Sequence, residues 1–302
     1  MSILVVGSVA LDTIKTAFSE KIDCLGGSAV FFSISASYFA PVNMVAVVGE
    51  DFPKNHVSFL KSRKNINISG LEIKESGKTF RWKASYACDI NNPQTLDTQL
   101  NVFAEFNPKI PEGYSRSTHL FLANIDPDLQ YRVLSQIQRP RVIACDSMNY
   151  WIKTKKPSLE KLLKNVDIYF VNDSEAKLLA QTGNLMKAAK DIIKMGPEIV
   201  VIKKGEHGVL FVSKSHPSFM IPAYLLENVI DPTGAGDTFA GGFMGYLSNQ
   251  ARLNSSSLRK AAVYGTIMAS FAVESFSVER LGSLKKSDIE KRYKEFIKLT
   301  RV

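Results

Sequence analysis

Four glycines stand around an internal carboxylate, Asp237, in the segment DPTGAGDTFAGGF, which runs from Asp231 to Phe243. Glycine destabilises helix and strand interiors, so this cluster indicates that the backbone approaches a ligand or a neighbouring element closely. A P-loop would require a Lys-Ser/Thr pair after its last glycine, and a dinucleotide fingerprint would follow the first strand. Neither pattern is present, so the chemistry has to be worked out from the segment itself.

The apolar spacing of TFAGGFMGYL predicts a helix over 237–248, with Gly234, Ala235 and Gly236 at its N-terminus. Unpaired N–H groups and the positive end of the helix dipole form an anion hole there, suited to a phosphate. Asp237 stands on the first turn, where the dipole is expected to favour its ionised form, and can accept the proton of an attacking hydroxyl. The pattern predicts phosphoryl transfer to an alcohol; helix capping and packing are the structural alternative.

Strand-like and helix-like runs alternate along most of the chain, which predicts a single α/β domain over 1–302, with a doubly wound, mainly parallel sheet flanked by helices. The expected strands are ILVVGSV (3–9), VNMVAVVG (42–49), THLFLAN (118–124), RVIACD (141–146), VDIYFVN (166–172) and EIVVIKK (198–204). The expected C-terminal helices cover 237–248, 255–274 and 286–299.

Two segments, about 12–24 and 71–106, are expected to form a small inserted β-sheet lid, with a structural flap as the alternative, because no helical period runs through the second of them. Within KTFRWKASYA, the alternation of a strand puts Phe80, Trp82 and Tyr86 on one face. This face is too apolar to remain in water. It should therefore cover the substrate or pair with a second lid, which predicts a homodimer through the lids.

Composition excludes several other classes of protein. The 302 residues contain no run of about 18 apolar residues, which predicts no membrane span. The net charge of +9 comes from dispersed lysines without a nucleic-acid motif, so a basic surface is expected and no nucleic-acid partner. The three cysteines are an odd number without metal-type spacing, which predicts a cytoplasmic protein without a disulfide framework.

The segment DPTGAGDTFAGGF closely resembles the C-terminal signature of the ribokinase-like, or PfkB-type, carbohydrate kinases. The resemblance covers essentially the whole chain and includes VVGSVALD, LGGSA, VAVVGEDF, VNDSEAKLL and VIKKGEHGV. It implies a ribokinase-like fold and phosphorylation of a sugar hydroxyl by ATP with Mg²⁺. A nucleoside (adenosine-like) kinase is the alternative enzyme, and a catalytically silent nucleotide-binding module is the alternative from another class. A Rossmann oxidoreductase is disfavoured because VVGSVALD has a single glycine after the first strand.

The resemblance also implies roles for individual residues. Asp237 matches the catalytic base, with Gly234, Ala235 and Gly236 as the anion hole. Asp12, Gly26 and Gly27 match the residues that bind the acceptor. Asn172, Glu175, Lys203 and Gly205 match the ATP side, with Glu175 holding Mg²⁺ through water, and Asp231 resembles a ligand of a K⁺ site.

One position departs from the pattern of the family. Ribokinases and many relatives have an asparagine four residues after the second glycine, where this chain has Phe31. A phenylalanine cannot make the same hydrogen bonds, so the acceptor pocket is more apolar there or Phe31 points into the core. Asn124, Asp146 and Asn149 follow predicted strands at their carboxyl ends, where open α/β sheets bind ligands, and are further candidates for the acceptor site.

Overall fold

The computed structural model describes residues 1–17, 19–86, 90 and 93–300. Within them, one sheet contains nine strands in the order β13-β12-β11-β10-β9-β8-β1-β4-β5. Its strands are β1 (Ile3–Val6), β4 (Val42–Gly49), β5 (Ile66–Lys74), β8 (His119–Leu122), β9 (Val142–Cys145), β10 (Ile168–Asn172), β11 (Ile199–Lys203), β12 (Val209–Ser213) and β13 (Phe219–Ile221). The strands from β5 to β11 pair in parallel, and β12 and β13 extend the sheet antiparallel.

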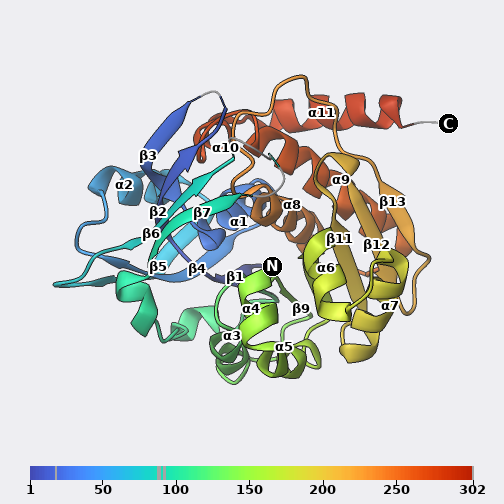
Figure 1. Cartoon of the computed structure of the whole chain (residues 1–302), viewed down its shortest axis with the longest axis horizontal. Helices are drawn as coiled ribbons and strands as arrows, with labels where there is room; N and C mark the ends of the chain where they lie inside the picture. The colour runs from blue at the N-terminus through green and yellow to red at the C-terminus, as the bar shows by residue number, and fades with distance from the viewer. Residues whose placement is uncertain (18, 87–89, 91–92, 301–302) are drawn as a thin grey trace.

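Helices cover both faces of this sheet (Figure 1). One layer contains α1 (Ser28–Ser37), α2 (Lys54–Ser62), α8 (Ala235–Ser248), α9 (Ser255–Ala272), α10 (Glu279–Ser283) and α11 (Lys286–Leu299). The other contains α3 (Pro127–Leu134), α4 (Asn149–Thr154), α5 (Lys156–Leu163), α6 (Asp173–Ala180) and α7 (Leu185–Met195). Strand β1 is apolar throughout because both of its faces are buried. Ile3 and Val5 face the core under the first layer of helices, and Leu4 and Val6 face the core under the second layer. The predicted fold class is confirmed.

The order of the strands creates a switch point beside β1. From β1 the chain passes to β4 and β5 on one side, and it then returns to β8 on the other side and continues to β11. Loops at the carboxyl ends of the strands diverge at such a point and leave a crevice. The residues that follow β1 and β8 are therefore placed where a ligand can bind.

A second sheet, here called the lid sheet, has the order β3-β2-β6-β7 and projects at the upper left of Figure 1. Its strands are β2 (Ala10–Lys15), β3 (Glu20–Gly26), β6 (Phe80–Ser85) and β7 (Gln94–Gln99). The predicted boundary at residue 71 is wrong, because β5 continues to Lys74 and pairs with β4 in the large sheet. Near the other end of the predicted lid segment, at residue 106, the last lid strand β7 has already ended at Gln99, and a short 3-10 helix, η1 (Asn101–Glu105), follows it.

Candidate functional site

The first turn of α8 presents the glycine cluster. Gly234 precedes the helix with φ of 72°, a left-handed conformation that glycine adopts without strain. The N–H of Ala235 is already engaged, since it donates to the Pro232 carbonyl at 3.2 Å. The next N–H groups, of Gly236 and Asp237, occupy positions for which a helix supplies no acceptor. Of the three predicted anion-hole residues, Gly236 thus has the N–H best placed for a phosphate.

Lys203, the last residue of β11, lies against this turn. A Cβ atom added to Gly236 would lie 2.9 Å from Lys203 Nζ. The same Nζ donates to Asp146 Oδ2 at 2.6 Å, although the two residues are 57 positions apart. Burial acts to lower the pKa of Lys203, but the charges of Asp146 and Glu175 outweigh it and keep the pKa above its ordinary value. Gly205 follows with φ of 53° and turns the chain towards β12.

Asp237 is half-buried on the same turn of α8. Burial raises the pKa of Asp237 to about 7, with a further contribution from the charge of Asp146, and Lys203 opposes the shift. The expectation that the helix dipole keeps this group readily ionised is therefore wrong, because desolvation dominates. A carboxyl with a pKa near neutrality is well matched to accepting a proton from an alcohol.

Asn172 and Glu175 form a capping box at the N-terminus of α6. Asn172 Oδ1 accepts from the Glu175 N–H at 2.8 Å, and Glu175 Oε2 accepts from the Asn172 N–H at 3.0 Å. The N–H of Asn149, at the start of α4, also donates to the Glu175 carboxylate. Burial and the charge of Asp146 raise the pKa of Glu175 to about 7. Asn149 and Asp146, predicted for the acceptor side, thus lie with Glu175 and Lys203.

Asp12 lies in β2 of the lid sheet and is 4% exposed. A Cβ atom on Gly26 would lie 1.8 Å from Asp12 Oδ2, so only glycine leaves room for this carboxylate. The N–H of Gly27, a residue with φ of 97°, donates to the same carboxylate. Burial raises the pKa of Asp12 to about 8, with a contribution from the charge of Asp231. The two glycines therefore fix Asp12 in one position.

Phe31 of α1 packs against the backbone of Gly234, at the start of α8. It is 1% exposed and belongs to the core between α1 and α8. A Cβ atom on Gly234 would lie 2.3 Å from its ring. With this burial the ring has no free surface for a ligand, so the expectation that Phe31 contacts the acceptor is wrong, and the alternative of a core position is correct.

Asn124 follows β8 at the switch point. Its Oδ1 is buried and has no hydrogen-bond partner within the described part of the chain. Since buried polar atoms are normally paired, this oxygen is suited to accept a hydrogen bond from a hydroxyl group of a ligand. Gln130, which the sequence pattern does not single out, donates from Nε2 to the carbonyls of Leu122, Ala123 and Asp146 and thereby ties β8 to β9.

Asp231 holds the loop that leads to α8. Its Oδ1 accepts from the Thr233 N–H at 2.9 Å, and its Oδ2 accepts from the Ser277 N–H at 3.2 Å. The Thr233 hydroxyl in turn donates to the hydroxyl of Tyr86, at 3.4 Å, on the lid sheet. These contacts give Asp231 a role in holding the loop; a K⁺ ion at this residue stays a prediction.

The apolar face of the lid sheet is turned towards the body of the protein. Trp82, Ala84 and Tyr86 pack with Ile14 of β2 and with Phe276. Phe80, on the same face, stacks on Phe103 with ring centroids 5.2 Å apart. The chain itself thus covers much of this apolar face, so the face can be buried without a second lid. A homodimer through the lids stays a prediction.

The comparison with known families identifies the chain. The model of the pfkB family of carbohydrate kinases matches residues 25–281. The chain belongs to this family. A cytidine kinase from Thermococcus kodakarensis is 31% identical over 249 residues, which are 81% of this chain and 87% of that protein. This PfkB-family protein is therefore an ATP-dependent phosphotransferase, a sugar or nucleoside kinase.

Two solved structures show that the fold is shared across this PfkB group. A nucleoside kinase from Methanocaldococcus jannaschii superposes with a TM-score of 0.77 at 22% identity, covering 97% of this chain and 98% of that one. A ribokinase from Giardia lamblia superposes with a TM-score of 0.80 at 17% identity, covering 98% and 99%. Since kinases of sugars and of nucleosides share the architecture, the fold alone does not select the acceptor.

Kinases of this family use ATP with Mg²⁺. Within the described residues, no three His, Cys, Asp or Glu side chains are grouped so that they could hold a metal ion by themselves. Glu175 and Asp146 nevertheless interact electrostatically beside Lys203. Mg²⁺ commonly keeps several waters and uses one or two carboxylates together with substrate phosphates, so these side chains fit the ion.

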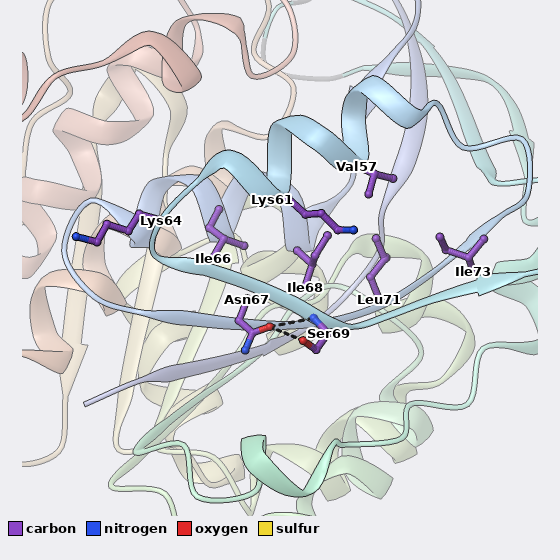
Figure 2. A pocket seen from close by; sticks show the side chains of 9 residues that line it. All are labelled: Val57, Lys61, Lys64, Ile66, Asn67, Ile68, Ser69, Leu71 and Ile73. Carbon is purple, nitrogen blue, oxygen red and sulfur yellow. Dashed lines mark hydrogen bonds between the residues drawn. The ribbon is translucent and has the colours of Figure 1, made fainter.

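Away from this site, a groove of about 650 Å³ lies between α2 and β5, lined by Val57, Lys61, Lys64, Ile66, Asn67, Ile68, Ser69, Leu71 and Ile73. Figure 2 shows Asn67 Oδ1 accepting from both the N–H and the hydroxyl of Ser69. This contact occupies a backbone donor of the edge strand β5, which reduces its ability to pair with another strand. None of the candidate site residues lines this groove. No helix in the described ranges has the length and apolar character needed to cross a membrane.

Proposed function

We propose that this kinase phosphorylates a nucleoside on a hydroxyl of its sugar, with ATP as the phosphate donor. The observation that supports this choice is the composition of one face of the lid sheet. Asp12 pairs directly with Trp82, and Ile14 pairs with Ala84, in the parallel ladder of β2 and β6. The Asp12 carboxyl, which can bind sugar hydroxyls, therefore stands next to the partly buried ring of Trp82, which is suited to stack on a base, while Ile14 and Ala84 are fully buried beside it.

The charges of the lid sheet also favour a neutral acceptor. Lys15, Arg81 and Lys83 alternate with the Asp12 face and so point to the opposite side of the sheet. On that side, Arg81 is paired with Asp23 and Asp51. On the Asp12 face, Lys21 pairs with Ile14 in the ladder of β2 and β3 and is already bonded to Glu279 at 2.9 Å. A sugar phosphate or sugar acid would thus meet carboxyl groups and a lysine that already has a partner. A free sugar is the second candidate, but it would leave the accessible part of the Trp82 ring without a stacking partner.

The similarity to the cytidine kinase supports the same choice, since it extends over 81% of this chain. It reverses the order of the two enzymes expected from the sequence, where the sugar came first. Cytidine is the first nucleoside to test.

In the proposed mechanism, Asp12 and Asn124 bind the acceptor and aim its hydroxyl at Asp237. Asp237 accepts the hydroxyl proton as the oxygen attacks the γ-phosphorus, and the bond from that phosphorus to the β–γ bridging oxygen breaks to release ADP. The Gly236 N–H and Lys203 stabilise the negative charge of the transferring group. Glu175 and Asp146 would hold Mg²⁺ through water, and the ion would neutralise part of the phosphate charge.

The test is a coupled assay of ADP release with cytidine, uridine, adenosine, ribose and fructose as acceptors, each at saturating ATP. Stacking on an aromatic side chain contributes about 1–3 kcal/mol per base, so cytidine should exceed ribose in kcat/KM by about 5- to 150-fold. Trp82→Ala should lose most of this preference while the KM for ATP stays the same. Equal or better use of a free sugar by the wild-type protein would overturn the proposal.

A further inference from the structure

Tyr86 connects the lid sheet to the catalytic loop. It follows β6, and its N–H continues the pairing with β2 by donating to the Lys15 carbonyl at 2.8 Å. The residue is 9% exposed, because its ring packs with Ile14, Ala84 and Phe276. Its hydroxyl, at the far end of the ring, accepts from the Thr233 hydroxyl at 3.4 Å. One rigid side chain therefore spans from the lid to the loop before α8.

Thr233 is held from two sides. Its N–H donates to Asp231 in the body of the protein, and its hydroxyl donates to Tyr86 in the lid sheet. It directly precedes Gly234, whose left-handed conformation begins the turn that exposes the Gly236 N–H. A displacement of Thr233 would be transmitted to this N–H within three residues. The position of the phosphate site thus depends in part on the position of the lid.

The hydrogen bond between the hydroxyl groups of Thr233 and Tyr86 is longer than usual and can shorten. Hydrogen bonds between hydroxyl groups are typically 2.5–3.0 Å long, at about 2.7–2.8 Å most often, so a separation of 3.4 Å is a weak bond. A small movement of the lid sheet towards α8 would bring it to full strength. An acceptor bound against Asp12 and the apolar surface would favour this movement, because it contacts both the lid sheet and the body.

We propose that Tyr86 is a positioning residue for phosphoryl transfer, which aligns the anion site of α8 with the acceptor when the lid closes, through its hydrogen bond to Thr233. The residue acts through the loop and needs no contact with either substrate. The proposal rests on the proposed function only in using the lid as the acceptor side of the site. It predicts that the contact contributes to turnover and not to binding of ATP alone.

The test is a double-mutant cycle of Tyr86→Phe and Thr233→Val, which remove the two hydroxyls with little change of shape. Each variant should lower kcat with cytidine by about 2- to 10-fold, the effect expected from one neutral hydrogen bond. The Thr233 side chain also hydrogen-bonds the Asp231 carboxylate, so the double variant should be no worse than Thr233→Val alone, since Tyr86→Phe removes only the bond that Thr233→Val has already removed. The Kd for a non-hydrolysable ATP analogue should stay within about twofold of wild type.

Tyr114→Phe is the matched control. Tyr114 is also a buried tyrosine, and its hydroxyl donates to the Asn67 carbonyl at 3.2 Å, beside β5 and away from the site. This variant should lower the melting temperature without lowering kcat. Unchanged kcat in Tyr86→Phe, additive losses in the double variant, or a loss of analogue affinity as large as the loss of kcat would each overturn the proposal.

A second readout keeps this test separate from the identity of the acceptor. With the ATP analogue bound, amide hydrogen exchange over residues 233–240 should be faster in Tyr86→Phe than in wild type, because the loop loses one of its two anchors. If the wild-type protein does not use cytidine, the proposed function fails, while the exchange measurement still tests Tyr86. Identical exchange in the two proteins would contradict the coupling itself.

Discussion

Replacing Gly26 by alanine tests whether this glycine leaves the space that the Asp12 carboxyl group needs in order to bind the acceptor. The added Cβ would lie 1.8 Å from Asp12 Oδ2 and 2.4 Å from Asp12 Cγ, far inside any van der Waals contact. Gly26 closes β3 and does not have a positive φ, so alanine brings no backbone strain of its own. Asp12 must therefore swing away from its place, while the fold around it can remain.

The size of the effect follows from the bonds that Asp12 would lose. Above about pH 8, where Asp12 is ionised, a hydrogen bond to its charged carboxylate contributes about 1.5–3 kcal/mol, so the loss of one bond to the acceptor should lower kcat/KM by about 10- to 150-fold. The assay is ADP release with the acceptor varied at saturating ATP, repeated with ATP varied. The KM for ATP should change little, because Lys203 and α8 are untouched.

Gly183→Ala is the control, since a Cβ at Gly183 meets no atom within 4 Å and its φ is not positive. In the Asp12→Ala background, Gly26→Ala should add little further loss, because no carboxylate remains to be displaced. The reasoning is refuted if Gly26→Ala keeps kcat/KM for the acceptor within twofold of wild type. It is also refuted if the losses of the two substitutions add.

Three further predictions concern the turn of α8. Asp237→Asn should fold normally and bind ATP with near-native affinity but lose about 10²- to 10⁴-fold in kcat, so turnover within tenfold of wild type would contradict its role as base. In the wild type, kcat should rise with pH through about 7 as Asp237 loses its proton. Stability should change in the opposite direction. The pKa of Asp237 in the folded protein lies above its ordinary value of 3.8, so its contribution to the free energy of unfolding is fully present below pH 3.8 and is lost as the pH rises through about 7. The melting temperature should thus fall more between about pH 4 and 7 in wild type than in Asp237→Asn, and parallel curves would argue against the shift. Gly234→Ala should lower the melting temperature more than Gly236→Ala, because its Cβ meets the rigid ring of Phe31 at φ of 72°, whereas the other meets the flexible end of Lys203; the reverse order would be the contrary result.

The parts of the fold that the sequence predicted are those with a local signal. The helix expected over 237–248 starts two residues earlier, at Ala235, and has Asp237 on its first turn as expected, because glycine and apolar spacing mark a helix start within one segment. The boundary of the lid failed for a physical reason. As the edge strand of the large sheet, β5 is buried only at Ile66 and is partly or fully exposed from Asn67 to Lys74, so its sequence looks like that of a lid strand.

The sequence predicted which residues belong to the candidate site better than it predicted how they are arranged in space. Position after a strand identified Asp146 but could not assign it to a side of the site, because its partner Lys203 lies on a different strand, 57 residues away. Phe31 illustrates the same limit. Its type suggested an apolar pocket, but only the packing of α1 against α8 shows that its ring lies beneath Gly234.

The two halves of the site belong to different parts of the molecule, and this explains how one chemistry can serve several acceptors. The groups proposed for phosphate lie on the large sheet and on α8, where a Cβ atom added to Gly236 would lie 2.9 Å from Lys203 Nζ. On the acceptor side, Asp12 and Trp82 belong to the lid sheet. Changes at Trp82, on the Asp12 face of β6, can thus alter the choice of acceptor without disturbing the phosphate groups, whereas a change at Tyr86 should lower the rate of phosphoryl transfer, because its hydroxyl contacts the loop before α8.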